Sequence, residues 1–338
     1  MKKILSLMLL QLFADGVVNT TTSVSAETDQ TFWKTAIIKL TGPKCVHDQF
    51  AQKTDIPSGN GKNAEFRKVN ALNTDIAVNT LVEGEAGEGQ ELTIVAVSSE
   101  VAQYGNYIKS TDMLELTAKD DIMDIATTAC SDQAASVMDK ITRNVMHQCT
   151  NSFCASGVAT LSAVKADTYL DPDDLFKASA RLEGVNAPTI DGFYVAIVHP
   201  HVAKDLMSKL NGSTAWTEVM KYADPSKILH GEVGTYGKVR VVTTTNAKFY
   251  AAGDTSLAGA PSGVGVFATI VVGRNAYGTT KIDGGGLELI THSKAEIGGP
   301  LNQFSTVGWK ATKAAEILVD QYMVKIYSSA SQLPGASN

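Results

Sequence analysis

Apolar residues recur every three or four positions between Thr117 and Gln148, and this spacing predicts one long helix. Aspartates crowd the expected first turns and cations gather near the other end, as the helix dipole favours. Neither Gly nor Pro interrupts the segment, so we expect about 30 residues and roughly 45 Å of helix. A two-helix hairpin broken near Ser131 is the alternative. The expected apolar stripe consists of Ile122, Ile125, Ala129, Val137 or Met138, Ile141 and Val145.

Two alternating segments precede this helix and predict a long β-hairpin. Ala64–Ala71 alternates between apolar and polar residues, and Leu92–Tyr107 does so more strongly, with Val and Ile enriched. Between them, Leu81–Gln90 contains three Gly and three Glu and has little to bury. Because an isolated hairpin is marginal in water, we expect it to lie on a neighbouring surface. A mobile loop on a monomer is the alternative.

The remaining residues predict a mixed α/β region. Pro172 and Gly184 bound a helix expected at Asp173–Glu183. The glycines of His230–Gly237 lead into a strand and not into a helix, so we interpret them as a turn and not as a phosphate loop. The other expected elements are a strand at 192–198, a helix at 202–210, a loop at 252–265, a strand at 266–273, a turn at 284–286 and a strand-like segment at 319–327.

The composition is globular, with 338 residues, 44% apolar and 19% charged. A net charge of -6 argues against a general nucleic-acid binder. No apolar run approaches the ~20 residues of a membrane span. At the start of the chain, Met1–Phe13 has two lysines before an apolar run, and Val24–Ala26 could be a cleavage site. From the residues alone, a secretory signal and an amphipathic arm remain equally open.

Candidate chemistry is sparse. His147, Cys149 and Cys154 could ligate a metal, and so could His199 with His201, but neither spacing is that of a known site. We interpret the four cysteines as free, partly buried thiols of a reducing compartment. No nucleophile, zinc-protease or phosphate-loop motif is present. We therefore assign no catalytic, cofactor-binding or metal residues, and a metal-dependent hydrolase is the least favoured alternative.

Four segments, in this order, give the chain a resemblance to the major capsid proteins of tailed phages, specifically the coliphage N-four-like family. They are Gly192–Pro200, His230–Gly234, Val272–Gly278 and, above all, Gly299–Lys310. The opening L-Q-L-F-A-D and the hairpin motifs R-K, L-V-E-G-E and Q-Y-G fit as well. This resemblance favours an N-terminal arm over a signal peptide. The rival function is an exported surface-layer protein, which cleavage after Ala26 would support.

The resemblance implies an α+β fold of the Hong Kong 97 type. Its parts would be an N-terminal arm at 1–53, an extended hairpin loop at 54–112, a spine helix and peripheral domain at 113–165, an axial domain at 166–300, and a return strand and tail at 301–338. It further implies a non-enzymatic protein that forms the pentamers and hexamers of an icosahedral head around double-stranded DNA. Scaffolding, decoration and portal proteins are candidate partners, and neither a cofactor nor a membrane is implied. The expected location is the virion, after assembly in the host cytoplasm.

Assembly would rest on repeated interfaces between copies. We expect the acidic hairpin tip, with Glu83, Glu85 and Glu88, to meet basic residues of a neighbouring copy. Arg67 and Lys68 are the candidate anchors at the base of the hairpin. For each charge, a solvated surface residue is the alternative. Deleting Val82–Gln90 is expected to leave a folded subunit that forms no closed particles.

Overall fold

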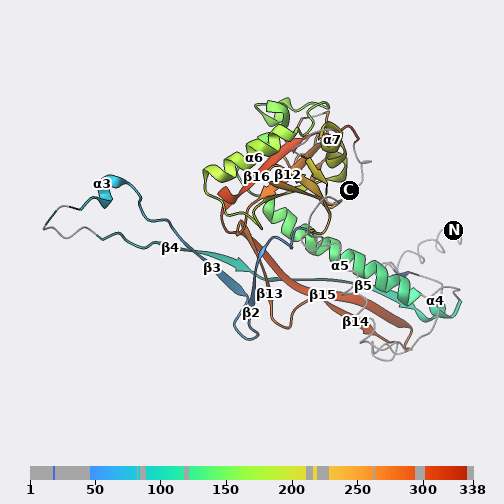
Figure 1. The fold of residues 1–338 in the computed structure, drawn as a ribbon. Helices are drawn as coiled ribbons and strands as arrows, with labels where there is room; N and C mark the ends of the chain where they lie inside the picture. Colours follow the sequence, from blue (N-terminus) through green and yellow to red (C-terminus); the bar gives the residue numbers. More distant parts are fainter. Residues whose placement is uncertain are drawn as a thin grey trace, which may run out of the picture. The chain divides into compact units, whose positions relative to one another are not determined.

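The computed structural model describes residues 18–19, 46–81, 83, 89–117, 122–210, 216–218, 228–261, 263–293 and 301–332. The chain divides into two compact units (Figure 1). The first unit contains residues 1–45, 102–139 and 284–313, and the second contains residues 46–101, 140–283 and 314–338. The amphipathic arm predicted at Met1–Phe13 lies outside the described residues. In the part of the chain that is described, no helix is both long and apolar enough to cross a bilayer.

The first unit is built on a sheet that one helix covers. Strand β15 (Phe304–Ile317) pairs antiparallel with β5 (Ala102–Thr111) on one side and with β14 (Glu288–His292) on the other. The two-residue strand β1 (Val18–Asn19) runs parallel to β5. Alternation turns the odd-numbered residues of β15 toward helix α5. Three bonds join the two elements: Cys130 Sγ to Val307 O at 3.7 Å, Trp309 Nε1 to Gln133 Oε1 at 3.1 Å, and Lys313 Nζ to Met138 O at 2.9 Å.

The predicted long helix is confirmed as α5 (Ile122–Met146), which has 25 residues. It runs unbroken through Ser131, so the two-helix alternative is wrong. A separate short helix, α4 (Asp112–Thr117), precedes it, and residues 118–121 between the two are outside the description. The helix is therefore shorter than expected, because the segment around Thr117 belongs to α4.

The predicted apolar stripe of α5 is wrong at Ile125 and Ala129, whereas its member Met138 is buried. Ile125 is 58% exposed, and the next predicted stripe residue, Ala129, is exposed as well. The buried line is instead Ala126, Cys130, Ala134 and Met138. Small side chains allow a helix to lie close against a sheet, so packing here selects the small residues. Size, and not only apolar character, decides which face of α5 is buried.

The second unit contains an eight-stranded sheet among its described residues. Seven strands follow the order β6-β16-β12-β7-β10-β9-β8, and β11 (Phe249–Tyr250) pairs with β12. All side chains of the central strands β7 (Tyr194–Val198), β12 (Val266–Val272) and β16 (Met323–Ser328) are buried. The remaining strands are β6 (Ser152–Cys154), β8 (Trp216–Glu218), β9 (Glu232–Tyr236) and β10 (Val239–Thr243).

Both faces of this sheet are covered, as its fully buried strands require. Helices α6 (Pro172–Gly184) and α7 (Pro200–Leu210) join the cluster on one face. Val46, Phe50 and Met146 join the cluster on the other face. The predicted helix at Asp173–Glu183 is confirmed as α6, and the Asp171 N–H donates to Asp174 Oδ2 at 3.1 Å at its start. The strand expected at 266–273 is confirmed as β12.

The glycine-rich segment His230–Gly237 is mostly a strand, so our interpretation of it as a turn is wrong. Its residues Glu232–Tyr236 form β9, which pairs antiparallel with β10. Turns remain at His230–Gly231, before β9, and at Gly237–Lys238, after it, and both Gly231 (78°) and Gly237 (57°) have the positive φ that glycine tolerates best. The glycines thus belong to a β-hairpin, in keeping with the rejection of a phosphate loop.

A separate group of strands in the second unit carries the predicted hairpin. Strand β2 (Gln52–Ile56) runs parallel to β13 (Tyr277–Ile282), which pairs with residues 314–317 of β15. Strands β3 (Asn63–Val69) and β4 (Ile94–Glu100) then form the hairpin. The single strand predicted at Leu92–Tyr107 is wrong, because it divides at Val101. That residue is buried and donates its N–H to Lys62 O at 2.8 Å, which ends β4 before β5 begins.

Candidate subunit interface

The base of the β3–β4 hairpin is fixed by apolar packing within the second unit. Ala64 and Val101 are buried in a cluster with Ile56 and Ala314. The Phe66 ring lies against the backbone of β13 at Gly278, where an added Cβ would come within 2.7 Å of the ring. Strands β3 and β4 lie side by side over seven residue pairs (Figure 1). The hairpin is therefore a rigid ribbon at its base.

Beyond Phe66, no other described segment packs against the hairpin. Every side chain described between residues 67 and 96 is exposed, and the two strands have no third partner among the described residues. Large apolar residues are frequent in this stretch, with Ile76 at 82% and Leu81 at 74% exposure. The others are Val69, Leu72, Val78, Leu92, Ile94 and Val95. So many exposed apolar side chains on one element indicate a surface that another molecule covers.

The outer part of the hairpin has a defined shape despite this exposure. The short helix α3 (Ile76–Asn79) lies near the tip, and Gln90 ties it to the returning chain. The amide of Gln90 accepts from Asn73 N at 2.9 Å and donates to Asn73 O at 3.1 Å and Asn79 Oδ1 at 3.0 Å. Asn79 Nδ2 in turn donates to Asp75 O at 2.8 Å. These bonds preorganise the residues around Ile76 before any partner binds.

Two of the predicted contact residues of the hairpin, Arg67 and Lys68, do not share one face of it. Arg67 and Lys68 are adjacent on β3, so their side chains point to opposite faces of the ribbon. Arg67 shares its face with Glu65, 3.8 Å away, whereas Lys68 shares its face with Phe66. Glu83 is exposed. Glu85 and Glu88 lie outside the described residues.

Sequence reasoning missed the apolar residues of the hairpin. The three glutamates indicate an acidic tip with nothing to bury. However, the residues that lead to it, V-N-A-L-N-T-D-I-A-V-N-T-L, contain a large apolar side chain every two to four positions. That density in a segment with no partner strand of its own is the signal that could have revealed the surface. The charged residues of this hairpin are a weaker sign of an interface than the apolar ones, because exposed ion pairs contribute little free energy.

The first unit also exposes large apolar side chains. Met113 and Leu116 lie one turn apart on α4, Ile125 follows on α5, and Tyr107 lies on β5. Tyr107 stands directly opposite Gly308 in the β5–β15 pairing, and a side chain at Gly308 would come within 2.7 Å of the Tyr107 Cβ. These residues do not belong to the predicted contacts.

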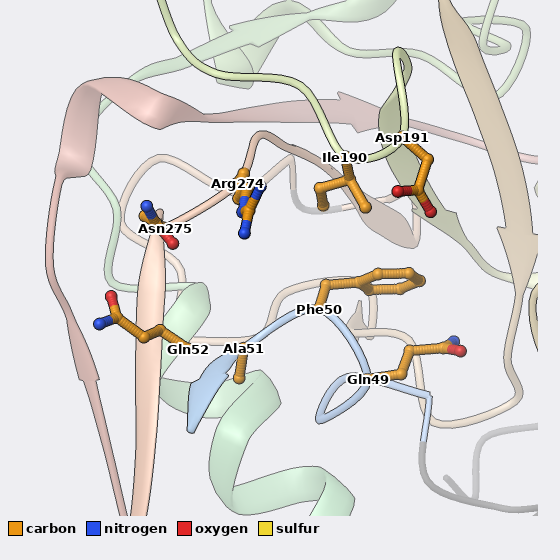
Figure 2. A pocket seen from close by; sticks show the side chains of 8 residues that line it. All are labelled: Gln49, Phe50, Ala51, Gln52, Ile190, Asp191, Arg274 and Asn275. Carbon is orange, nitrogen blue, oxygen red and sulfur yellow. The ribbon is translucent and has the colours of Figure 1, made fainter. Parts of the chain in front are cut away.

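A pocket of about 370 Å³ opens in the second unit (Figure 2). Arg274 and Asn275 come from the turn between β12 and β13, Asp191 comes from the turn before β7, and Phe50 and Gln49 come from the segment before β2. Asp191 and Asn275 both have positive φ, 51° and 59°, which these residue types tolerate. The lining holds one acid, Asp191, and one cation, Arg274, so the pocket suits contact with polar groups.

Among the described residues, the histidines and cysteines belong to no cluster of three or more candidate metal ligands. His199 and His201 stack with ring centroids 4.9 Å apart, beside Phe267. Burial, and then the charge of His201, lowers the pKa of His199 to about 4. Cys130, Cys149 and Cys154 are free and buried, and burial raises the pKa of each thiol. Such thiols are inert.

Comparison with known proteins identifies the fold. A family model described as phage capsid protein matches residues 170–294. No curated protein matches the sequence. Among solved structures, the capsid of Ralstonia phage GP4 matches at 12% identity over 96% of this chain and 98% of that one, with a TM-score of 0.70. The capsid asymmetric unit of cyanophage Pam1 matches at 14% identity over 95% and 98%, with a TM-score of 0.60.

The same fold also occurs outside phages. An encapsulin, SrpI from Synechococcus elongatus, matches at 9% identity over 99% of this chain and 98% of that one, with a TM-score of 0.51. These likenesses show that the chain has the α+β fold of phage major capsid proteins, the Hong Kong 97 type, as the sequence resemblance implied. The chain is thus similar to phage capsid proteins both in its match to the family model and in its likeness to the capsid structures.

Proposed function

We propose that this chain is the major capsid protein of a tailed double-stranded DNA phage. In this role it is a structural protein of the virion and has no enzymatic activity. The observation that carries the proposal is the match to the GP4 phage capsid over 96% of the chain. The phage capsid family model at 170–294 supports it independently. The finer identification as a coliphage N-four-like protein rests on the sequence motifs alone.

In the proposed shell, copies of the chain assemble into pentamers and hexamers in the host cytoplasm and enclose the genome. The hairpin of one copy lies on the next copy. The preorganised apolar residues around Ile76 and Leu81 supply the main contact, because their burial contributes about 25 cal/mol per Å² of apolar surface. Arg67, Lys68, Glu83, Glu85 and Glu88 then help to select the register. Scaffolding, decoration and portal proteins are further candidate partners.

The proposed domain ranges follow the same scheme. They are an arm at 1–53, the extended hairpin loop at 54–112, the spine helix and peripheral domain at 113–165, the axial domain at 166–300 and the return strand with the tail at 301–338. The break at Val101 supports one adjustment: the hairpin ribbon ends there, and β5 belongs with the spine helix in the first unit. The long strand β15 fits a return strand.

Electron microscopy of the concentrated full-length chain tests the function. We expect closed icosahedral particles, and a chain that stays monomeric under all assembly conditions would contradict the proposal. Because encapsulins share the fold, the content of particles isolated from the source decides between the two. Double-stranded DNA inside supports the phage head, and a protein cargo without a genome contradicts it. A chain lacking Val82–Gln90 is expected to fold but to form no closed particles.

A further inference from the structure

A pocket lies on the sheet of the first unit, on the face that points away from α5. Tyr107 of β5 and Ile290 of β14 both stand directly opposite Gly308 of β15, the middle one of these three strands (Figure 1). Residues paired in this way point to the same face of a sheet. Because Gly308 has no side chain, a pocket of about 380 Å³ opens above it, between Tyr107 and Ile290. We call it the Gly308 pocket.

The Gly308 pocket is open and has apolar walls. The Tyr107 side chain is 67% exposed, although Tyr107 stands in the middle of a paired strand, and Ile290 is half-buried. Next to the pocket on the same face, Lys310 Nζ lies 3.7 Å from Glu288 Oε2, so this cation already has a partner. Pockets that bind ligands have volumes of about 300–1,000 Å³ and are mostly apolar. The Gly308 pocket therefore suits an apolar side chain.

Strand β1 brings the start of the chain to this sheet. Its residue Val18 stands opposite Lys109 of β5. Because the two strands run parallel, the chain comes to Val18 alongside the residues that precede Lys109, among them Tyr107. Residues 1–17, which lead to Val18, are outside the described residues. They reach the sheet at the edge from which the Gly308 pocket is approached.

The sequence that leads to β1 is strongly apolar. Between Ile4 and Phe13, only Ser6 and Gln11 are polar. The linker Ala14–Val17 connects this segment to β1, and its four residues span about 13 Å when extended. Strand β15 lies two strand spacings, about 10 Å, from β1. The apolar segment is therefore long enough, and close enough, to lie over the Gly308 pocket.

We propose that the segment Met1–Phe13 docks in the Gly308 pocket of its own copy, with a leucine side chain between Tyr107 and Ile290. Contact between the two apolar surfaces removes both from water, which is the main favourable term in association. The short linker gives the segment a high effective concentration at its own pocket, and this favours the same copy over a neighbour. The contact forms before assembly and does not depend on the function proposed above.

Photo-crosslinking of the full-length chain tests this contact. The photoreactive residue p-benzoylphenylalanine replaces Tyr107, an exposed aromatic position, and mass spectrometry identifies the crosslinked peptides. We expect a crosslink to residues 1–17 of the same chain in the unassembled protein. The control carries the same probe in place of Met113, which is 61% exposed on α4 of the same unit, and it should not form this crosslink.

Substitutions in the segment test whether apolar contact holds it in place. Leu7→Asp with Leu10→Asp should lower the yield of the crosslink at position 107 about tenfold, because burying a single leucine already shifts an equilibrium by more than that factor. Lys2→Gln with Lys3→Gln removes two charges and keeps the apolar residues, so the yield should not change. A yield that falls only for the lysine variant would overturn the proposal.

A mixture of isotopically heavy and light copies distinguishes the possible occupants of the pocket. A crosslink within one copy supports the proposal. Crosslinks found only between copies would overturn it, whether they join the N-terminal segment or the hairpin residues 67–96 of a neighbour. The absence of any crosslink to residues 1–17 would overturn it as well. The unassembled chain suffices for the test, so the outcome does not depend on whether closed particles form.

Discussion

Arg240 and Glu232 form a buried ion pair across the β9–β10 hairpin. Their side chains are only 8% and 0% exposed, and Arg240 Nε lies 3.7 Å from Glu232 Oε1. The guanidinium also lies over the Phe193 ring at 5.0 Å. Removing charges from water is costly, so the pair is tolerated only while both partners are present.

Replacing one partner of this pair should therefore destabilise the protein strongly. We expect Glu232→Ala to lower the free energy of unfolding by about 3–5 kcal/mol, because it leaves a buried, uncompensated guanidinium. Glu232→Leu combined with Arg240→Met should cost much less. Urea unfolding of the unassembled chain measures both. If the single variant is as stable as the double variant, the pair is not effectively buried.

His199 makes stability depend on pH. Its pKa of about 4 in the folded chain lies below the usual value of 6.5, so the unfolded chain binds the proton more readily. The free energy of unfolding is therefore highest above about pH 6.5. It falls, by about 3 kcal/mol at most, as the pH drops toward 4. His199→Asn retains an oxygen that can accept the His201 N–H, which now reaches His199 Nδ1 at 3.2 Å. In urea unfolding, the difference in the free energy of unfolding between pH 4.5 and pH 7 should be smaller for this variant than for the unsubstituted chain. Replacing the exposed His230 by Asn should leave that difference unchanged.

At the scale of the element, α5 shows how packing selects a face. The sequence pattern predicts that Ile125 and Ala129 face the sheet. The residues buried against it are instead Ala126 and Ala134, whose small side chains allow the helix to lie close to β15. The prediction follows that Ala134→Leu overpacks the contact and costs about 1–3 kcal/mol. Ile125→Gln should change the free energy of unfolding by less than about 0.5 kcal/mol. Thermal unfolding of the two variants measures both effects. If Ile125→Gln is the more destabilising variant, the helix face expected from the sequence is the buried one.

The hairpin shows the opposite situation, because its apolar residues find no partner within the described chain. Ile76→Ser with Leu81→Ser should leave the stability of the unassembled chain nearly unchanged, since both side chains are exposed. The yield of closed particles should fall sharply, because the apolar contact between copies is lost. Ile76→Val with Leu81→Met keeps the apolar character and serves as the control. Normal shells from the serine variant would show that these residues do not contact a neighbour.

At the scale of the whole molecule, assembly and export make different demands on the start of the chain. A shell protein that assembles in the cytoplasm has no use for cleavage after Ala26. We expect mass spectrometry of the protein from purified particles to find the residues before Ala26 retained. A mature chain that begins at Glu27 would support export and the surface-layer alternative.

Several elements could be predicted because their signals are local. Pro172 and Gly184 bound α6, and the apolar run Val266–Val272 is β12. The division of Leu92–Tyr107 could not be predicted. Its alternation is continuous, and only the pairing of β4 with β3 and of β5 with β15 separates the two strands. At the candidate interface, the sequence located the hairpin but not the apolar residues that it presents.

The sequence by itself determined the order of elements and their resemblance to capsid proteins, because caps, turn residues and periodicity act over a few neighbouring positions. Tertiary structure alone decided which face of α5 is buried, where the long alternating segment divides, and which hairpin residues stay uncovered. Each of these depends on contacts between segments far apart in the chain, such as Cys130 with Val307 and Phe66 with Gly278. Burial is a property of such contacts, and no local pattern contains them.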